Sequence, residues 1–252
     1  MRKILTALTC IALLTTVASA DIARVEMGVG AWMQTPSGKI SYTKSGGTGS
    51  DISKKNQETQ PYVWALLKHP VPVIPNLRLE YVSLENIGNA TGTFKEFTAS
   101  GGKTSLKMTQ FDIIPYYNIL DNTAWLTLDL GLDLKVTEIK YEAANVTGIP
   151  VGTDYSDSTT VVIPLLYVRG RVEIPATNIG LEADVKYVSY DSNTIYDVRA
   201  KVDYTLYFIP VIQPAIEVGY RIQKIKLNDS SAGDAKADLD FSGFYAGLMI
   251  RF

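Results

Sequence analysis

Acidic and basic side chains recur at every second position in several stretches of this 252-residue chain. Residues two apart lie on the same face of a β-strand. We therefore predict one charged face formed by Asp129, Asp133, Lys135, Arg169, Arg171, Glu182, Asp184, Lys186, Asp197, Arg199, Lys201, Asp203, Glu217 and Arg221. The same interpretation adds the acids Glu26, Glu80, Asp112 and Glu173 and the bases Arg24, Arg78 and Lys107. The two signs nearly balance, which favours paired charges in a narrow, largely plugged polar lumen over an ion-selective ring of one sign.

Residues suited to catalysis or metal binding are few. The single histidine, His69, lies beside Pro70 in a predicted turn, and no serine or acid has an obvious place next to it for nucleophilic catalysis. With one cysteine, Cys10, in a segment that we expect to be removed, we predict no metal site and no cofactor. The glycine-rich segment 46–50 lacks the strand–helix context of a phosphate-binding loop. Solvated loop acids, rather than cation ligands, are expected at Asp51, Asp154 and Asp157.

The elements that must position the charged face are long alternating strands. Between Ala124 and Val136 one face is made of leucine flanked by alanine and valine, and segments 179–187 and 196–208 repeat the alternation. These segments reach or exceed the roughly 9–11 residues that a tilted strand needs to cross a bilayer. About ten strands are expected, within a range of eight to twelve, the others being segments 23–33, 62–68, 77–84, 106–119, 162–174, 216–222 and 243–252. Segments 77–84 and 106–119 each require a phase slip, which a β-bulge would supply.

The predicted connections are of two kinds. Four are short and lie near residues 70–75, 121–123, 175–178 and 209–214, whereas segments 36–60, 89–103, 143–158 and 228–236 read as longer polar loops. Aromatic residues near the short turns are expected to form an interfacial girdle: Tyr116, Tyr117, Tyr204, Tyr207 and Phe208. Short turns at one rim and long loops at the other are typical of transmembrane β-barrels.

The first twenty residues have the pattern of a secretory signal peptide. Arg2 and Lys3 precede an apolar stretch, and the small residues 18–20 predict cleavage after Ala20. We expect residues 21–252 to form a single exported barrel domain. Removing the leader leaves 22 basic and 26 acidic residues, a net charge of −4, so nucleic acid is not an expected partner.

The last ten residues predict a strand that ends on an aromatic residue. Its apolar face consists of Phe244, Ala246, Leu248 and Ile250, and the chain stops at Phe252. Together with the leader and the alternating strands, this tail resembles the small outer-membrane β-barrel proteins of Gram-negative bacteria, in particular a mostly uncharacterised group of epsilon- and delta-proteobacteria. The resemblance implies an all-β, antiparallel, up-and-down transmembrane barrel in the outer membrane, with both termini periplasmic. It also implies an assembly signal formed by Phe244, Leu248, Ile250 and Phe252, read by the barrel-assembly machinery with the help of periplasmic chaperones.

Function is less constrained than fold. The charged interior favours a narrow channel for small polar solutes, and the long loops favour a structural or surface-interaction barrel that binds an unknown ligand. An outer-membrane hydrolase would need a histidine near the extracellular rim, but His69 is predicted in a periplasmic turn, so we expect no enzymatic activity. Beyond outer-membrane lipid, the sequence identifies no partner, solute or ligand.

One strand register can be predicted from charge alone. In the hairpin that turns at Asp191–Ser192, residue numbers that sum to 383 place three pairs of opposite charge side by side: Lys186 with Asp197, Asp184 with Arg199, and Glu182 with Lys201. A sum of 385 would oppose Lys186 and Arg199. Like charges directly opposite are destabilising, so the register of 383 is expected.

Overall fold

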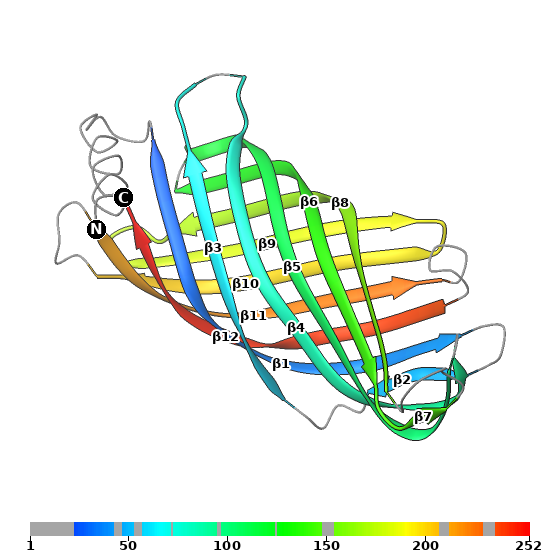
Figure 1. Cartoon of the computed structure of the whole chain (residues 1–252). Helices are drawn as coiled ribbons and strands as arrows, with labels where there is room; N and C mark the ends of the chain where they lie inside the picture. The colour runs from blue at the N-terminus through cyan, green and yellow to red at the C-terminus, as the bar shows by residue number, and fades with distance from the viewer. Residues whose placement is uncertain are drawn as a thin grey trace, which may run out of the picture.

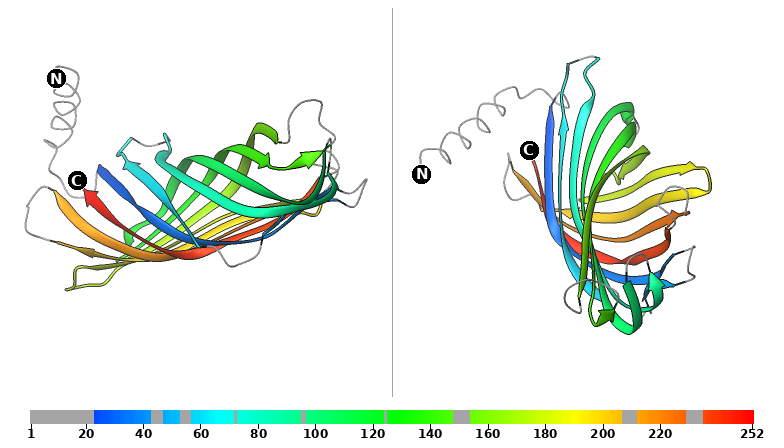
Figure 2. Two further views of the ribbon diagram at one scale, coloured as in Figure 1. Left: turned by 60° about the horizontal axis from the view of Figure 1, so that its bottom comes forward. Right: turned by 45° about the vertical axis from the view of Figure 1, so that its right-hand side comes forward.

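The computed structural model describes residues 23–42, 47–52, 57–71, 73–94, 97–123, 125–147, 154–206, 212–228 and 235–252. Twelve strands form one antiparallel sheet in the order β2-β4-β3-β1-β12-β11-β10-β9-β8-β6-β5-β7, and a β4–β5 pairing completes the circle (Figures 1 and 2). Ten strands make the closed barrel: β1 (Arg24–Tyr42), β3 (Glu58–Lys68), β4 (Asn76–Phe94), β5 (Phe97–Thr123), β6 (Leu126–Ala143), β8 (Tyr155–Glu173), β9 (Ile179–Tyr190), β10 (Asn193–Thr205), β11 (Gln213–Leu227) and β12 (Ala235–Arg251). The short strands β2 (Thr48–Ile52) and β7 (Val146–Thr147) are additions at one rim. The all-β barrel fold and its ten strands are confirmed.

The first and last strands close the barrel. β1 pairs with β12 from Glu26–Arg251 onward, and the backbone N–H of Phe252 donates to the carbonyl of Val25 at 2.9 Å. Both ends of the described chain therefore lie at one rim (Figure 1), which we call the terminal end; the opposite rim is the distal end. No helix among the described residues is long and apolar enough to cross a membrane. The predicted leader, with its cleavage site at Ala20, lies outside the described residues.

Side-chain direction in the terminal half of the barrel follows the alternation of the sequence. Leu132 on β6 and Phe244 and Leu248 on β12 are exposed on the outside, at 57%, 61% and 64% of their surface, whereas the alternating charged residues are buried inside. Apolar side chains on the outer face and polar ones in the lumen are the arrangement of a barrel surrounded by lipid. The predicted apolar faces of these strands are confirmed.

The β9–β10 hairpin has the predicted register. Lys186 pairs with Asp197, Asp184 with Arg199 and Glu182 with Lys201. Asp191 and Ser192 form a two-residue turn with φ values of 47° and 65°, as the type I′ turn requires to match the twist of the strands. Complementary charges thus select the register that the turn geometry also allows.

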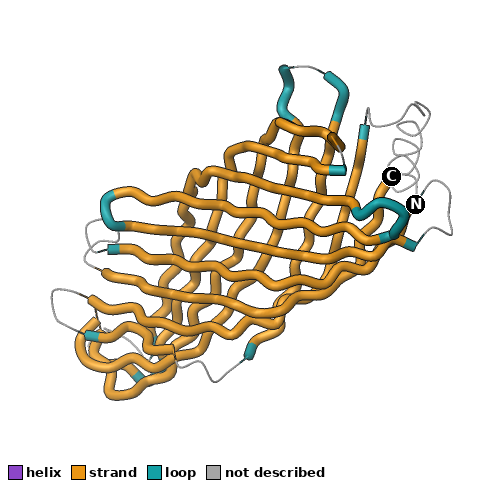
Figure 3. Tube along the Cα trace, turned by 180° about the vertical axis from the view of Figure 1, so that it is seen from behind, coloured by secondary structure: helices purple, strands orange, loops and turns teal. Residues whose placement is uncertain are grey.

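Two of the four predicted long loops, 36–60 and 89–103, are wrong, because strands occupy most of these segments; strand predominates along the described chain (Figure 3). β1 extends to Tyr42, and β4 and β5 run as paired strands from Asn89–Lys103 up to Phe94–Phe97. The Gly-, Ser- and Thr-rich composition that reads as loop belongs to strands whose outer face is polar. The other two predicted loops agree better with the strand bounds: β6 ends at Ala143 and β8 begins at Tyr155, and β11 ends at Leu227 and β12 begins at Ala235.

The phase slip predicted within segment 77–84 is wrong, and the one predicted within segment 106–119 occurs only at its end, between Asn118 and Leu120. Even-numbered residues face inward without interruption from Asn76 to Ala90 and from Thr104 to Tyr116, and the register first shifts beyond Asn118. Consequently Lys107 is exposed outside rather than inside, and Tyr116 is a buried lumen residue rather than part of a girdle. Tyr117 and Tyr204 are exposed outside; Tyr207 and Phe208 lie outside the described residues.

Toward the distal end, beyond the buried charges of the terminal half, the polarity of the two faces of the barrel wall is inverted. On the inner face, Arg78 and Glu80 of β4 are followed by Val82 and Leu84, and Asp197 of β10 is followed toward the distal end by Ile195. The outer face changes in the opposite sense: Ile222 of β11 gives way to Lys224, which lies 3.1 Å from Asp238 and Asp240. The hydrogen bonds to Asp238 and Asp240 raise the pKa of Lys224. An apolar interior beneath a charged outer surface is typical of a structure surrounded by water. We call this part of the barrel wall, between the charged half of the lumen and the distal rim, the distal extension.

Candidate functional site

All fourteen charged residues that the sequence assigns to the lumen are buried inside the barrel. Glu26, Arg78, Glu80 and Asp112 join them, as does Arg251, which the prediction did not include. Glu173 and Arg24 lie at the terminal mouth, where they pair at 3.2 Å. Of the residues predicted to face inward, Lys107 is the one that the structure places outside.

Glu182 is the centre of the network near the terminal end. Its carboxylate accepts hydrogen bonds from Arg169 at 2.7 Å, Arg78 at 3.3 Å and Arg171 at 3.4 Å, and Lys201 Nζ lies 3.6 Å away. Each of these cations has a second carboxylate partner: Asp129 for Arg169, Glu80 for Arg78, Asp203 for Arg171 and Glu217 for Lys201. Burial of charges is tolerated because they are paired and hydrogen-bonded in this way.

A second group of pairs lies on the distal side of Glu182. Lys186 contacts both Glu80 and Asp112, and Lys135 donates to Asp112 at 2.8 Å. Arg199 bridges Asp184 and Glu80, each at 2.8 Å, and Arg221 donates to Asp197 at 2.9 Å. Lys186 of β9 and Arg199 of β10 reach carboxylates of β4 and β5, which do not neighbour β9 or β10 in the sheet, so these pairs cross the lumen.

Aromatic residues of β3 complete the filling of the lumen. Trp64 lies between two cations, with Arg78 Cζ at 5.0 Å and Lys201 Nζ at 4.4 Å from its ring centroid, as cation–π contacts require. Its indole N–H and the hydroxyl of Tyr62 both donate to Glu217, at 3.0 and 2.7 Å. The sequence analysis did not identify these residues, because segment 62–68 is apolar on both faces.

Glycines on the facing strands make room for these aromatic rings. A Cβ at Gly28 would overlap with the indole of Trp64, and one at Gly30 or Gly247 would overlap with the hydroxyl of Tyr62. Glycines recur on the inward face of β1, β11 and β12, and a glycine within a strand indicates that another group approaches the backbone closely. This pattern could have predicted bulky side chains in the lumen.

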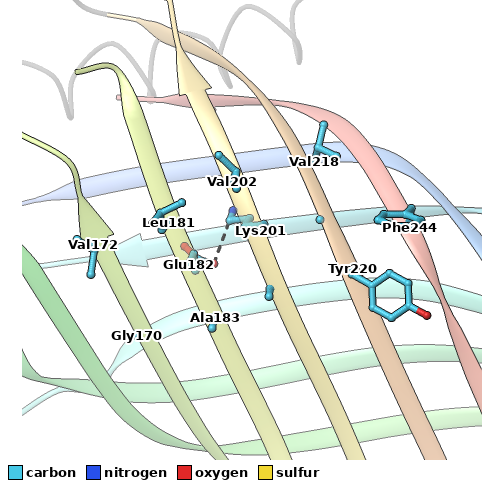
Figure 4. A pocket seen from close by; sticks show the side chains of 12 residues that line it. Gly170, Val172, Leu181, Glu182, Ala183, Lys201, Val202, Val218, Tyr220 and Phe244 are labelled. Carbon is cyan, nitrogen blue, oxygen red and sulfur yellow. Dashed lines mark ion pairs between the residues drawn. The ribbon is translucent and has the colours of Figure 1, made fainter.

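A hollow of about 580 Å³ lies on the outer face over Gly170, Ala183 and Ala200, beside the edge-to-face pair Tyr220 and Phe244 (Figure 4). At the terminal mouth, the hollow between Arg24, Tyr116 and Arg171 measures about 20 Å³, close to the room that one water molecule needs. The fourteen predicted lumen charges are each 5% exposed or less, so side chains fill the charged half of the lumen.

His69 lies in the turn between β3 and β4 at the terminal end. The N–H of Val71 donates to its Nδ1 at 3.2 Å, so the neutral ring donates from Nε2 to the carbonyl of Pro75 at 3.0 Å. Both ring nitrogens therefore serve the turn. Among the described residues, no group of three histidine, cysteine or acidic side chains is arranged to hold a metal ion.

The distal extension has an apolar core of its own. Phe97 of β5 stacks on Tyr141 of β6, with ring centroids 6.3 Å apart, and lies 4.9 Å from the ring of Tyr155. Below these rings, Leu84, Leu106, Met108, Leu239 and Phe241 are buried. These residues form an apolar layer on the distal side of the charged network, and the buried uncharged residues Asn86, Gln110 and Gln223 lie at the same end of the lumen.

No protein-family model and no curated protein sequence matches the chain. Among solved structures, the outer membrane protease OmpT from Escherichia coli matches with a TM-score of 0.57 and 12% identity, over 94% of this chain and 99% of that one. The toluene transporter TodX from Pseudomonas putida (TM-score 0.30, 10% identity) and a FadL homologue from Pseudomonas aeruginosa (0.31, 10%) each match over 92% of this chain and 90% of theirs. These structural neighbours are Gram-negative outer-membrane β-barrels, and the likeness concerns the fold.

Proposed function

We propose that this protein is an integral outer-membrane barrel that acts through its distal extension as a surface for interaction with other molecules, and that it has no enzymatic activity. The packed lumen carries this proposal. Paired charges fill the terminal half, and buried apolar and uncharged polar side chains fill the lumen on their distal side, so a route for solutes would require displacing both groups. The narrow channel predicted from the sequence remains the alternative, favoured by the polar lining.

The distal extension offers a rigid platform for such an interaction. Among the described strands, β8 pairs with β6 from Tyr155 to Val172 but with β9 only from Leu166 onward. Pro164 has no N–H to continue the ladder toward β9. The segment from Tyr155 to Leu165 consequently presents one strand edge, and exposed edges are where extended segments of other proteins can add.

Conductance decides between the two functions. Refolded protein in a planar lipid bilayer at neutral pH should show no steady single-channel current, and a heat-modifiable band on unboiled gels would establish that the same sample is folded. As the matched variant, Arg169→Ala combined with Glu182→Ala empties part of the lumen and should raise the frequency of current events. Steady conductance of the wild-type protein would refute the proposal and establish the channel.

Surface labelling tests the location of the distal extension. The only cysteine is in the predicted leader, so a single cysteine can be introduced without others in the way. Thr160→Cys lies on the exposed part of β8, and Val73→Cys, at a position that is 86% exposed, lies in a turn at the terminal end. A membrane-impermeant maleimide should label Thr160→Cys in intact cells and Val73→Cys only after lysis. The reverse result would place the distal extension in the periplasm and contradict the proposal.

A further inference from the structure

The buried charges of the lumen are unequal in number. Among the residues that the structure describes, ten carboxyl side chains are buried but only nine basic ones: Arg78, Lys135, Arg169, Arg171, Lys186, Arg199, Lys201, Arg221 and Arg251. Nine of the ten carboxylates accept a hydrogen bond from at least one of these cations: Glu26, Glu80, Asp112, Asp129, Glu182, Asp184, Asp197, Asp203 and Glu217. At the terminal mouth, Arg24 pairs with the buried Glu26 at 2.6 Å and with Glu173 at 3.2 Å; counting Arg24 and Glu173 together adds one charge of each sign and leaves the excess unchanged.

Asp133 is the tenth carboxyl group. Its side chain is fully buried, and neither of its oxygens has a hydrogen-bond partner. Lys135 Nζ approaches to 4.0 Å but donates instead to Asp112, at 2.8 Å. The residues that face Asp133 from the strands around it are Asp112 on β5, Glu80 on β4, Lys186 on β9, and Leu165 and Tyr167 on β8.

Strand register explains why Asp133 has no hydrogen-bond partner. Asp129, four residues earlier on the same face of β6, is paired across the sheet with Arg169, whereas Asp133 is paired with Leu165. Leu165 is 1% exposed and belongs to the apolar layer that begins at this level. Asp133 therefore lies where the charged half of the lumen meets the apolar layer. Its register partner on β8 is Leu165, which cannot donate a hydrogen bond from its side chain.

We propose that Asp133 is a proton-binding site, occupied in the folded barrel at neutral pH. An ionised carboxylate that is excluded from water and accepts no hydrogen bond is far more costly to bury than the neutral acid. With one proton on Asp133, nine buried cations face nine buried carboxylates. Loss of that proton to water leaves one uncompensated negative charge beside the apolar layer. This inference concerns the lumen and does not depend on what the distal extension binds.

Infrared spectroscopy of the refolded barrel tests the proposal directly. A protonated carboxyl group has a C=O stretching band that ionised carboxylates lack. We expect this band in the wild-type protein at neutral pH, its loss in Asp133→Asn, and its retention in the matched variant Asp129→Asn. Absence of the band from the wild-type spectrum, or its persistence in Asp133→Asn, would overturn the proposal. The wild-type spectrum decides even if a variant fails to fold.

Unfolding provides a second, independent readout. At about pH 4, where the unfolded chain also holds the proton, Asp133→Asn replaces a neutral acid by a neutral amide and should leave the denaturant midpoint unchanged. Asp129→Asn leaves Arg169 with one partner fewer and should lower the midpoint. The folded wild-type protein would hold a proton that the unfolded chain releases above about pH 4. Its midpoint should therefore fall from about pH 5 to about pH 8 more steeply than that of Asp133→Asn. Parallel pH profiles, or an equal loss of stability in both variants, would refute proton binding.

Discussion

Replacing Glu182 by glutamine removes the central negative charge of the lumen while conserving side-chain size. Four cations lie within 3.6 Å of this carboxylate, and its side chain is 1% exposed. Breaking a buried ion pair by removing one partner costs about 3–5 kcal/mol, because the other charge stays buried without compensation. Each of the four cations keeps a second carboxylate, and glutamine still offers one carbonyl acceptor. We therefore expect the lower end of the range, a loss of about 3 kcal/mol in the free energy of unfolding.

The matched control is Glu138→Gln on the distal extension. Glu138 pairs with Lys140 at 3.1 Å, but the two side chains are 46% and 56% exposed, and surface pairs of this kind contribute about 0–1 kcal/mol. Urea unfolding from lipid vesicles can be followed by tryptophan fluorescence, because Trp32 and Trp64 are buried in the lumen. If Glu182→Gln is no less stable than Glu138→Gln, the lumen network does not stabilise the fold and the reasoning fails.

Three further outcomes follow from backbone and packing. Gly28→Ala should cost about 1–3 kcal/mol because its Cβ overlaps with Trp64, whereas Gly170→Ala, whose Cβ meets no atom within 4 Å, should be neutral in the same unfolding assay. Ser192→Gly relieves a positive φ of 65° and should raise stability by about 0.5 kcal/mol; a lower unfolding midpoint would contradict the turn geometry. Deletion of Phe252 should reduce the amount of barrel assembled in the outer membrane much more than it lowers the stability of refolded protein, and normal assembly would refute its role as a signal.

Alternation and charge predicted the terminal half of the barrel well. The pairing of Asp184 with Arg199 followed from placing opposite charges side by side, and the outward leucines of β6 followed from period two. These features depend on neighbours along one strand or across one hairpin. A register shift of one residue would move every side chain to the other face of the sheet, so the alternating pattern of one strand or hairpin fixes both its faces and its register. Local sequence is therefore sufficient to predict these features.

Contacts across the lumen were not predictable in the same way. Trp64 and Tyr62 contact Glu217, which lies more than 150 positions later in the chain. Nothing within segment 62–68 distinguishes the inward residue Trp64 from the outward residue Val63, because both are apolar. The missing hydrogen bond of Asp133 could not be predicted either, since it depends on the register between β6 and β8, which places Leu165 opposite Asp133.

The phase slips expected in β4 and β5 show why the distal extension was missed. Asp112 and Lys107 of β5 lie on opposite faces, so a rule that polar residues point inward requires a bulge between them. Between these residues β5 keeps one phase, and what changes along the strand is the polarity of its two faces. Phe111 on the outer face is flanked by the buried polar residues Gln110 and Asp112, whereas Lys107 on the outer face is flanked by the buried residues Leu106 and Met108. A barrel strand that passes from lipid into water requires this reversal of face polarity without a break in alternation, so the polar outer residue does not demand a bulge.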